Sequence, residues 1–196
     1  MVSSLERLKG YNIILASASP RRKELLSKLD IDFNVKILPD IDESFPVNMP
    51  VVKVPQHISR KKAEAYRPGM GENDLVIAAD TIVAVGRRIL GKPADETAAR
   101  DMLKLLSGRS HRVITGVTIM TKERMETFST VSRVCFDIMS DEEIDYYVNK
   151  YRPLDKAGAY GIQEWIGMIG VSELHGSYFN VMGLPVQRLY ARLKTF

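Results

Sequence analysis

The chain has 196 residues, of which 45% are hydrophobic and 27% are charged, a composition typical of one globular domain. Its formal net charge of +4 suits a small anionic substrate, and no basic block with interleaved aromatic residues indicates a nucleic acid partner. The single cysteine excludes an intrachain disulfide. Because the sequence also shows neither a signal pattern nor a membrane-spanning apolar run, we expect a cytoplasmic protein with no membrane partner and a single domain over residues 1–196.

The first strong pattern in the chain is an apolar strand followed by a helix with two arginines in its first turn. The strand ends in small residues that carry hydroxyl groups, Ser19 is a preferred N-cap residue, and Pro20 fits the first helical position. The free N–H groups of a helix start attract anions, and Arg21 and Arg22 add two full charges there. The stretch predicts a phosphate site; a solvated basic helix start is the plainer alternative.

The next elements bring carboxylates and lysines. Residues 32–38 are typical of a strand, and the loop at 39–44 holds Asp40, Asp42 and Glu43. Such a loop is either a solvated connection or a set of oxygen ligands for a divalent metal. A helix is expected over 55–67, and its basic cluster at residues 60–62 is by itself most simply a solvent-exposed face.

Residues 74–85 form the most hydrophobic stretch of the chain and predict a strand that is buried on both faces. Asp80 and Thr81 stand in its middle. Because burying a carboxylate without a partner is costly, Asp80 must be paired, bound to a metal or exposed in a cleft. This placement is the strongest local indication of catalysis, and the alternative is a buried aspartate that caps a neighbouring loop.

The second half of the chain continues with regular elements. An amphipathic helix is expected over 96–106, a β-hairpin from 111–121 and 125–139, and a helix that begins at Ser140. Residues 176–185 are interpreted as a short strand and turn before a C-terminal helix. The order of these elements predicts one α/β unit with a mixed sheet.

Two further positions carry candidate binding groups. Lys92 stands between glycine and proline, with its ammonium free to reach an anion. Small residues at 157–161 let the backbone approach a ligand or another strand closely. Gln163 follows them and is either a surface residue or an amide that faces a nucleotide base.

Several chemistries lack their motifs. The sequence contains no P-loop, no dinucleotide-binding glycine run and no Gly-x-Ser-x-Gly elbow, and its three histidines are too far apart to form a helical metal pair. Basic residues for phosphate and carboxylates for metal and water activation remain, and this inventory indicates metal-assisted hydrolysis of a phosphoanhydride. The residues concerned are Arg21, Arg22, Lys62, Lys92, Glu43 and Asp80.

An ordered set of short motifs resembles one known family. The motifs are SASPRR at 17–22, DES at 42–44, ADTIV at 79–83, GKP at 91–93, LSG at 106–108 with His111, DKAGAYGIQ at 155–163 and GLP at 183–185. Together they resemble the Maf family of nucleoside triphosphate pyrophosphatases over nearly the whole chain. The resemblance implies an inosine-triphosphatase-like (Ham1) α/β fold, with a mixed central sheet, flanking helices and two lobes around a cleft, and a homodimer.

The resemblance also implies a house-cleaning reaction, the hydrolysis of dTTP, UTP and modified pyrimidine nucleotides to the monophosphate and pyrophosphate, with Mg²⁺ or Mn²⁺ as cofactor. In the family's pattern Asp80 accepts the proton of the attacking water, and Glu43 and Asp80 are the carboxylates at the metal. The matching substrate-binding positions are Ser17, Arg21, Arg22, Lys62 and Lys92, and those that set base preference are Arg21, Thr81 and Gln163.

Two other functions stay open from the sequence: a nucleotide-binding regulator that arrests division, and a pyrophosphatase for another triphosphate such as 7-methyl-GTP. Asp80 favours an enzyme, because a pure binding protein needs no carboxylate beside a bound polyphosphate. The run GAYGIQ at 158–163 is similar to that of the dTTP and UTP branch of the family. The run SRKKA at 59–63 departs from the family's usual Leu-Ala-x-x-Lys-Ala.

Overall fold

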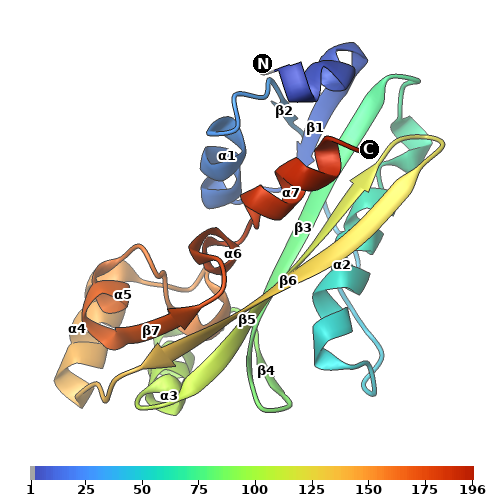
Figure 1. The fold of residues 1–196 in the computed structure, drawn as a ribbon. Coiled ribbons are helices and arrows are strands. Elements are labelled where there is room, and N and C mark those ends of the chain that lie inside the picture. The colour runs from blue at the N-terminus through green and yellow to red at the C-terminus, as the bar shows by residue number, and fades with distance from the viewer. Residues whose placement is uncertain (1–2) are drawn as a thin grey trace. The chain divides into compact units, whose positions relative to one another are not determined.

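The computed structural model describes residues 3–196 and contains a mixed seven-stranded sheet in the order β2-β1-β3-β5-β6-β7, with β4 paired to β3 (Figure 1). Strand β1 is parallel to β2 and β3, whereas β4 is antiparallel to β3 and β7 to β6. The predicted mixed sheet with flanking helices is therefore confirmed. The strands are β1 Asn12–Ala16, β2 Asn34–Val35, β3 Asp74–Val85, β4 Arg88–Leu90, β5 Ser110–Met120, β6 Met125–Phe136 and β7 Val171–His175.

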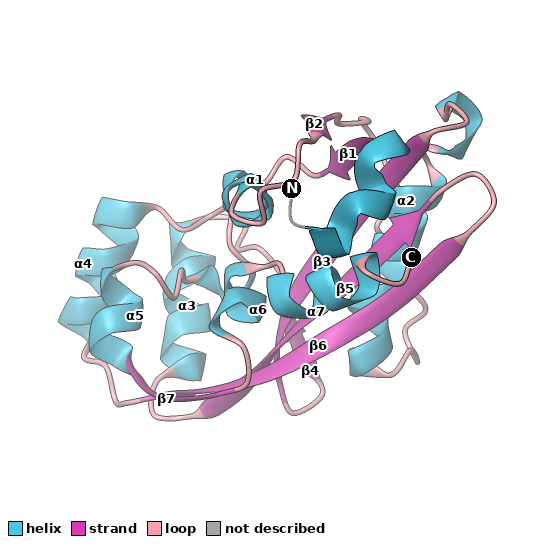
Figure 2. Cartoon of the chain, turned by 45° about the horizontal axis from the view of Figure 1, so that its top comes forward, coloured by secondary structure: helices cyan, strands magenta, loops and turns pink. Residues whose placement is uncertain are grey.

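Helices α1 to α5 lie between these strands along the chain, and α6 and α7 follow β7 (Figure 2). Short 3₁₀ segments occur at η1 Ser3–Gly10, η2 Val51–Lys53, η3 Arg67–Gly69 and η4 Ala157–Ala159. Within residues 3–196 no helix combines the length and the hydropathy that crossing a bilayer requires. The α-helices are α1 Pro20–Ser27, α2 Val54–Glu64, α3 Glu96–Leu106, α4 Asp141–Tyr151, α5 Trp165–Gly170, α6 Tyr178–Met182 and α7 Val186–Leu193.

The described chain divides into two compact units. The first comprises the chain up to Asp80 together with Thr115–Thr130 and Gly183–Phe196. The second comprises Thr81–Ile114 and Val131–Met182. Each of the long strands β3, β5 and β6 therefore contributes residues to both units.

The first unit is built on the parallel pair β1 and β3. Ile14 lies opposite Val76 and Ala16 opposite Ala78, and these side chains form one buried cluster with Ala63 of α2. Because successive strand residues point to opposite faces, the alternate residues of β1 and β3 are buried on the other side of the sheet. Burial on both faces explains why β3 is apolar throughout, as its sequence predicted.

The second unit packs α3 against α4 and holds its helix ends with side-chain caps. The Asp95 carboxylate accepts the Ala98 N–H at the start of α3. Ser140 and Glu143 form a capping box at the start of α4. These caps fix the helix starts at the residues that the sequence predicted.

Two expectations about short elements were wrong. The strand expected over 32–38 is only Asn34–Val35, and both residues are exposed. The strand and turn expected at 176–185 contain α6 instead. The reason lies in the chain around Asn180, whose N–H donates to the Ser177 hydroxyl and whose buried amide donates to the Val113 carbonyl, 3.1 Å away. This contact is distant in the sequence, so local propensity could not reveal it.

Gly116 of β5 makes the closest backbone approach in the first unit and gives a stability test. A Cβ at this position would lie 2.2 Å from the Pro55 carbonyl oxygen and 2.5 Å from the Gln56 nitrogen. Because backbone atoms cannot yield without moving α2, we expect Gly116→Ala to lower the free energy of unfolding by about 2–3 kcal/mol in urea denaturation. The control is Gly69→Ala, which meets open space. Equal stability of the two variants would contradict this packing.

Candidate active site

The centre of the candidate site is the Lys62 ammonium, which lies between two carboxylates. Its Nζ is 2.9 Å from Asp80 Oδ1 and 3.0 Å from Glu43 Oε1. The side chains of Lys62 and Asp80 are only 14% and 12% exposed, whereas that of Glu43 is 55% exposed. Asp80 is therefore paired, as its place in an apolar strand requires. The structure brings these three predicted residues together.

Helix α2 carries Lys62. Contacts made by the buried face of this helix fix its rotation about its own axis, and with it the position of Lys62. Ile58, Ser59 and Ala63 form part of the buried face of the helix. The Ser59 hydroxyl lies 3.0 Å from the Thr118 hydroxyl of β5, inside the first unit. Lys62 lies three residues after Ser59, at the border of this buried face, and its Nζ reaches both carboxylates from there.

The neighbouring Lys61 anchors the loop that carries Glu43. Its Nζ is 2.5 Å from Asp42 Oδ2 and donates to the Ser44 carbonyl at 3.2 Å. The Ser44 N–H and hydroxyl both donate to the Asp42 carboxylate, each at 2.9 Å. The bond from Lys61, followed by those from Ser44, holds the pKa of Asp42 well below its usual range.

The basic cluster at residues 60–62 is therefore more than a solvent-exposed face. Arg60 pairs with Glu64 on the helix surface, at 2.9 Å. Lys61 and Lys62 instead reach the carboxylate loop and Asp80. The sequence offered no signal for the role of Lys61, because its partner lies 19 residues away in the chain.

The strand-to-helix stretch around Arg22 is also built as expected. Ser19 caps α1 by accepting the Arg22 N–H at 3.4 Å. The Arg22 guanidinium donates to the Gly183 carbonyl at 2.9 Å and to the Ser17 hydroxyl at 3.3 Å. The role of the Gly183 carbonyl was missed from sequence, because a backbone acceptor leaves no residue-type signal.

Charge around Arg22 links it to the Lys62 cluster. Burial lowers the pKa of the Arg22 guanidinium, the charges of Asp80 and Glu43 raise it, and the charge of Arg21 lowers it. Arg22 is thus within electrostatic reach of both carboxylates and of Arg21. The solvated helix start, the plainer alternative, does not describe Arg22.

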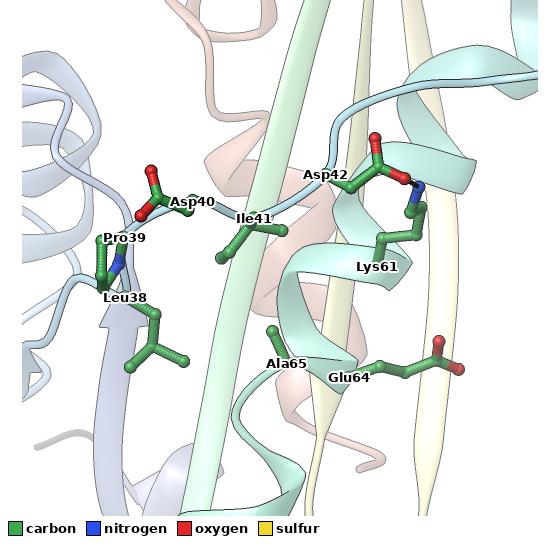
Figure 3. A pocket seen from close by; sticks show the side chains of 8 residues that line it. All are labelled: Leu38, Pro39, Asp40, Ile41, Asp42, Lys61, Glu64 and Ala65. Atoms are coloured by element: carbon green, nitrogen blue, oxygen red, sulfur yellow. Dashed lines mark hydrogen bonds and ion pairs between the residues drawn. The ribbon is translucent and has the colours of Figure 1, made fainter.

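An open hollow of about 540 Å³ is lined by residues of the 38–42 loop and of α2 (Figure 3). Figure 3 shows the Lys61 ammonium meeting Asp42 at one side of it. Two of the lining residues, Leu38 and Ile41, are partly buried and pack against the hydrophobic core of the first unit. The lining residues are Leu38, Pro39, Asp40, Ile41, Asp42, Lys61, Glu64 and Ala65.

The remaining candidate residues belong to the second unit. Thr81 follows Asp80 in β3 and is half-buried, and Lys92 is exposed after β4. Gln163 is half-buried, and within residues 3–196 its Oε1 has no hydrogen-bond partner although that atom is buried. Of the candidate residues, the first unit contains Ser17, Arg21, Arg22, Glu43, Lys62 and Asp80, and the second contains Thr81, Lys92 and Gln163.

The small residues before Gln163 have a packing explanation. Gly158 adopts a positive φ of 71°, and a Cβ there would lie 2.9 Å from the Val83 side chain of β3. Its N–H donates to the Gly91 carbonyl at 3.0 Å, next to Lys92. Of the two alternatives that the sequence left open at this glycine, close approach to another strand is the one observed.

No group of three or more histidine, cysteine, aspartate or glutamate side chains that could hold a metal ion occurs within the described chain. The carboxylates that the resemblance places at a metal, Glu43 and Asp80, form a pair on either side of Lys62. Any metal held here would depend on a small protein ligand set.

Comparison with known proteins gives consistent matches over the full length. A family model described as Maf-like protein matches residues 12–196. A protein of Parabacteroides distasonis named dTTP/UTP pyrophosphatase is 57% identical over 98% of this chain and 100% of its own length. A protein of the same name from Bacteroides thetaiotaomicron is 54% identical over 97% of this chain and 98% of its own.

Solved structures with lower identity share the fold. The structure of the Staphylococcus aureus Ham1 protein aligns with a TM-score of 0.56 at 17% identity, over 94% of this chain and 98% of that one. A HAM1 protein from Coxiella burnetii aligns with a TM-score of 0.51 at 17% identity, over 95% of this chain and 100% of that one. The predicted Ham1-like fold is confirmed.

The anchoring role of Lys61 can be tested through the pKa of Asp42. Lys61→Met removes the largest cause of its depression, so we expect the pKa of Asp42 to rise toward 3.8 in an NMR titration of the carboxyl carbons. The depressed pKa adds stability above pH 3.8 that is lost as the pH falls, so the variant's loss of stability should shrink in acid. Lys53→Met, which removes a contact to Gln56, is the control. An unchanged titration in Lys61→Met would contradict the anchor.

Proposed function

The chain belongs to the Maf family, and on this premise we propose that it hydrolyses dTTP and UTP to the nucleoside monophosphate and pyrophosphate. The names of its close relatives support this reaction. The observation that carries the proposal is the Lys62 ammonium between Asp80 and Glu43, with the Arg22 guanidinium in electrostatic reach.

Hydrolysis of a phosphoanhydride requires a base for water, neutralisation of phosphate charge and positioning of the reactants. Asp80 is proposed as the base, and its bond to Lys62 fixes the position of the carboxylate. Arg21 and Arg22 would hold and neutralise the leaving pyrophosphate, and the bonds of Arg22 to Ser17 and Gly183 hold its guanidinium in place. Lys92 and Lys62 are the further cations proposed for the phosphates.

The proposed cofactor is Mg²⁺ or Mn²⁺, and the residues present fit it. Glu43 and Asp80 already share one cation, the Lys62 ammonium, and both offer the hard carboxylate oxygens that these metals prefer. One or two protein carboxylates are the usual number where substrate phosphates supply further ligands. When bound, the metal would neutralise charge on the phosphate oxygens.

Base preference is proposed to depend on Gln163, together with Arg21 and Thr81. The buried Oε1 of Gln163 is an acceptor without a partner among the described residues. Thymine and uracil present the same N–H group between two carbonyls, and that group suits such an acceptor. A base that lacks this N–H donor leaves the Gln163 Oε1 unpaired and therefore binds less tightly. A homodimer is a further part of the proposal and rests on the family resemblance. A cytoplasmic location and a single domain are also proposed, on the composition and length of the sequence.

The proposed function is tested by pyrophosphate release from dTTP, UTP, GTP and 7-methyl-GTP, in the wild-type protein and in Asp80→Asn. We expect release from dTTP and UTP, and a fall in kcat of about 10²–10⁴-fold in the variant, because it lacks the base. Binding of dTTP, measured by calorimetry, should stay within a few-fold of wild type. The control is Asp30→Asn, an exposed position after α1 whose positive φ asparagine tolerates.

Two results of this experiment would contradict the proposal. Unchanged turnover in Asp80→Asn would remove Asp80 as the base. Binding of dTTP without release of pyrophosphate by the wild-type protein would instead favour a nucleotide-binding regulator. Release from 7-methyl-GTP alone would move the substrate to the other branch of the family.

The arginines give a second test. Arg21→Ala and Arg22→Ala should each cost about 2–5 kcal/mol of transition-state stabilisation, because each removes a full charge from the phosphates. The measurement is kcat/KM for dTTP, with the unfolding midpoint recorded for each variant. Lys23→Ala, an exposed cation on the same helix, is the matched control. A loss below tenfold in either arginine variant would mean that the phosphates lie elsewhere.

A further inference from the structure

A buried histidine of the second unit makes a contact that the proposed reaction does not use. His111 of β5 is 2% exposed, and its Nε2 lies 2.7 Å from the Tyr160 hydroxyl. Both rings pack edge-to-face with Phe136 of β6, with centroid distances of 5.0 Å from His111 and 4.9 Å from Tyr160. This three-ring cluster joins β5 and β6 to the loop that contains Tyr160.

Packing alone does not explain a histidine here. Burial lowers the pKa of His111 to about 4 and raises that of Tyr160, so both side chains are neutral near pH 7. The Nδ1 of His111 is buried without a hydrogen-bond partner in the described chain. In either tautomer one polar group is therefore unsatisfied, which costs stability. A phenylalanine would fill a similar volume without that cost.

Tyr160 lies at the start of a short turn and is held there by the hydrogen bond of its hydroxyl. Other hydrogen bonds hold the residues that follow it. The Gly161 N–H donates to the Tyr147 hydroxyl at 3.1 Å, and the Glu164 N–H donates to the Gly161 carbonyl at 3.0 Å. Glu164 in turn bonds to Tyr147 and pairs with the buried Lys156 at 3.1 Å. Gln163 lies within this turn, between Tyr160 and Glu164.

From these contacts we infer that His111 is a positioning residue for base selection, which holds Tyr160 and thereby sets the place of the Gln163 amide. The inference rests on the proposed function, because the task it gives to His111 is to serve the base contact of Gln163. The hydrogen bond to Tyr160 offsets part of the free-energy cost of the unpaired Nδ1. A Gln163 side-chain amide that is already held in place loses no conformational entropy when a base binds. His111 itself touches neither the phosphates nor the water in this account.

The test uses His111→Phe, which keeps a ring against Phe136 but removes the hydrogen bond. We expect the ratio of kcat/KM for dTTP over dCTP, whose base lacks the ring N–H, to fall at least tenfold, mainly through a higher KM for dTTP. The unfolding midpoint should change little, because the variant removes the unpaired Nδ1 but leaves the buried Tyr160 hydroxyl without its partner. Tyr160→Phe should lower the ratio by a similar factor, and the double variant should be no worse than either single one.

Two further variants complete the set. His111→Gln keeps a hydrogen-bonding group near the position of Nε2 and should restore part of the selectivity. His175→Gln is the matched control, because His175 is exposed and bonds to Glu173 on the surface of the same unit. Hydrogen exchange of the backbone N–H groups of Gly161 and Gln163, measured without nucleotide, should be faster in His111→Phe than in this control.

The outcomes separate the inference from the proposed function. A lower unfolding midpoint with unchanged selectivity in His111→Phe would show a purely structural histidine and overturn the inference. Faster exchange with unchanged selectivity would overturn it as well. A wild-type protein that does not discriminate between dTTP and dCTP would instead overturn the base preference in the proposed function. Unchanged exchange in His111→Phe would then refute the positioning role by itself.

Discussion

The ion pair between Lys62 and Asp80 is the constraint on which the rest of the first unit depends. A carboxylate in the middle of a buried strand must have a cation beside it, and in this protein that cation comes from α2. The helix therefore has to lie close to the sheet. Gly116, whose missing side chain leaves room for the Pro55 backbone, and the contact of Ser59 with Thr118 meet that requirement. The Lys62–Asp80 ion pair thus holds α2 near the sheet and also positions the proposed base.

The same ammonium also attracts a second carboxylate, and this makes the arrangement suited to catalysis. Glu43 reaches Lys62 because its loop is anchored one residue away, by Lys61. Two adjacent lysines on one helix thereby perform different tasks. In the proposed function the pair of carboxylates serves water and metal, while Arg21 and Arg22 serve the phosphates. Gln163, in a turn that buried contacts hold, is the residue proposed for the base.

Much of this could be predicted where the signal is local. Asp80 stood out because a charged residue interrupts an apolar run, and the start of α4 followed from its capping residues. Contacts between distant segments could not be predicted in the same way. The Gly183 carbonyl that holds Arg22 and the amide of Asn180 that supports α6 are examples, since a sequence does not record which backbone group lies opposite a side chain.

The central claim is that water activated by Asp80 displaces a pyrophosphate held by Arg21 and Arg22, so that the attack falls on the α-phosphorus. Hydrolysis of dTTP in ¹⁸O-labelled water, followed by mass spectrometry of both products, tests this directly. The label is expected in dTMP, and the pyrophosphate is expected to stay unlabelled. Label in the pyrophosphate would mean attack on the β-phosphorus and would contradict the roles given to both arginines.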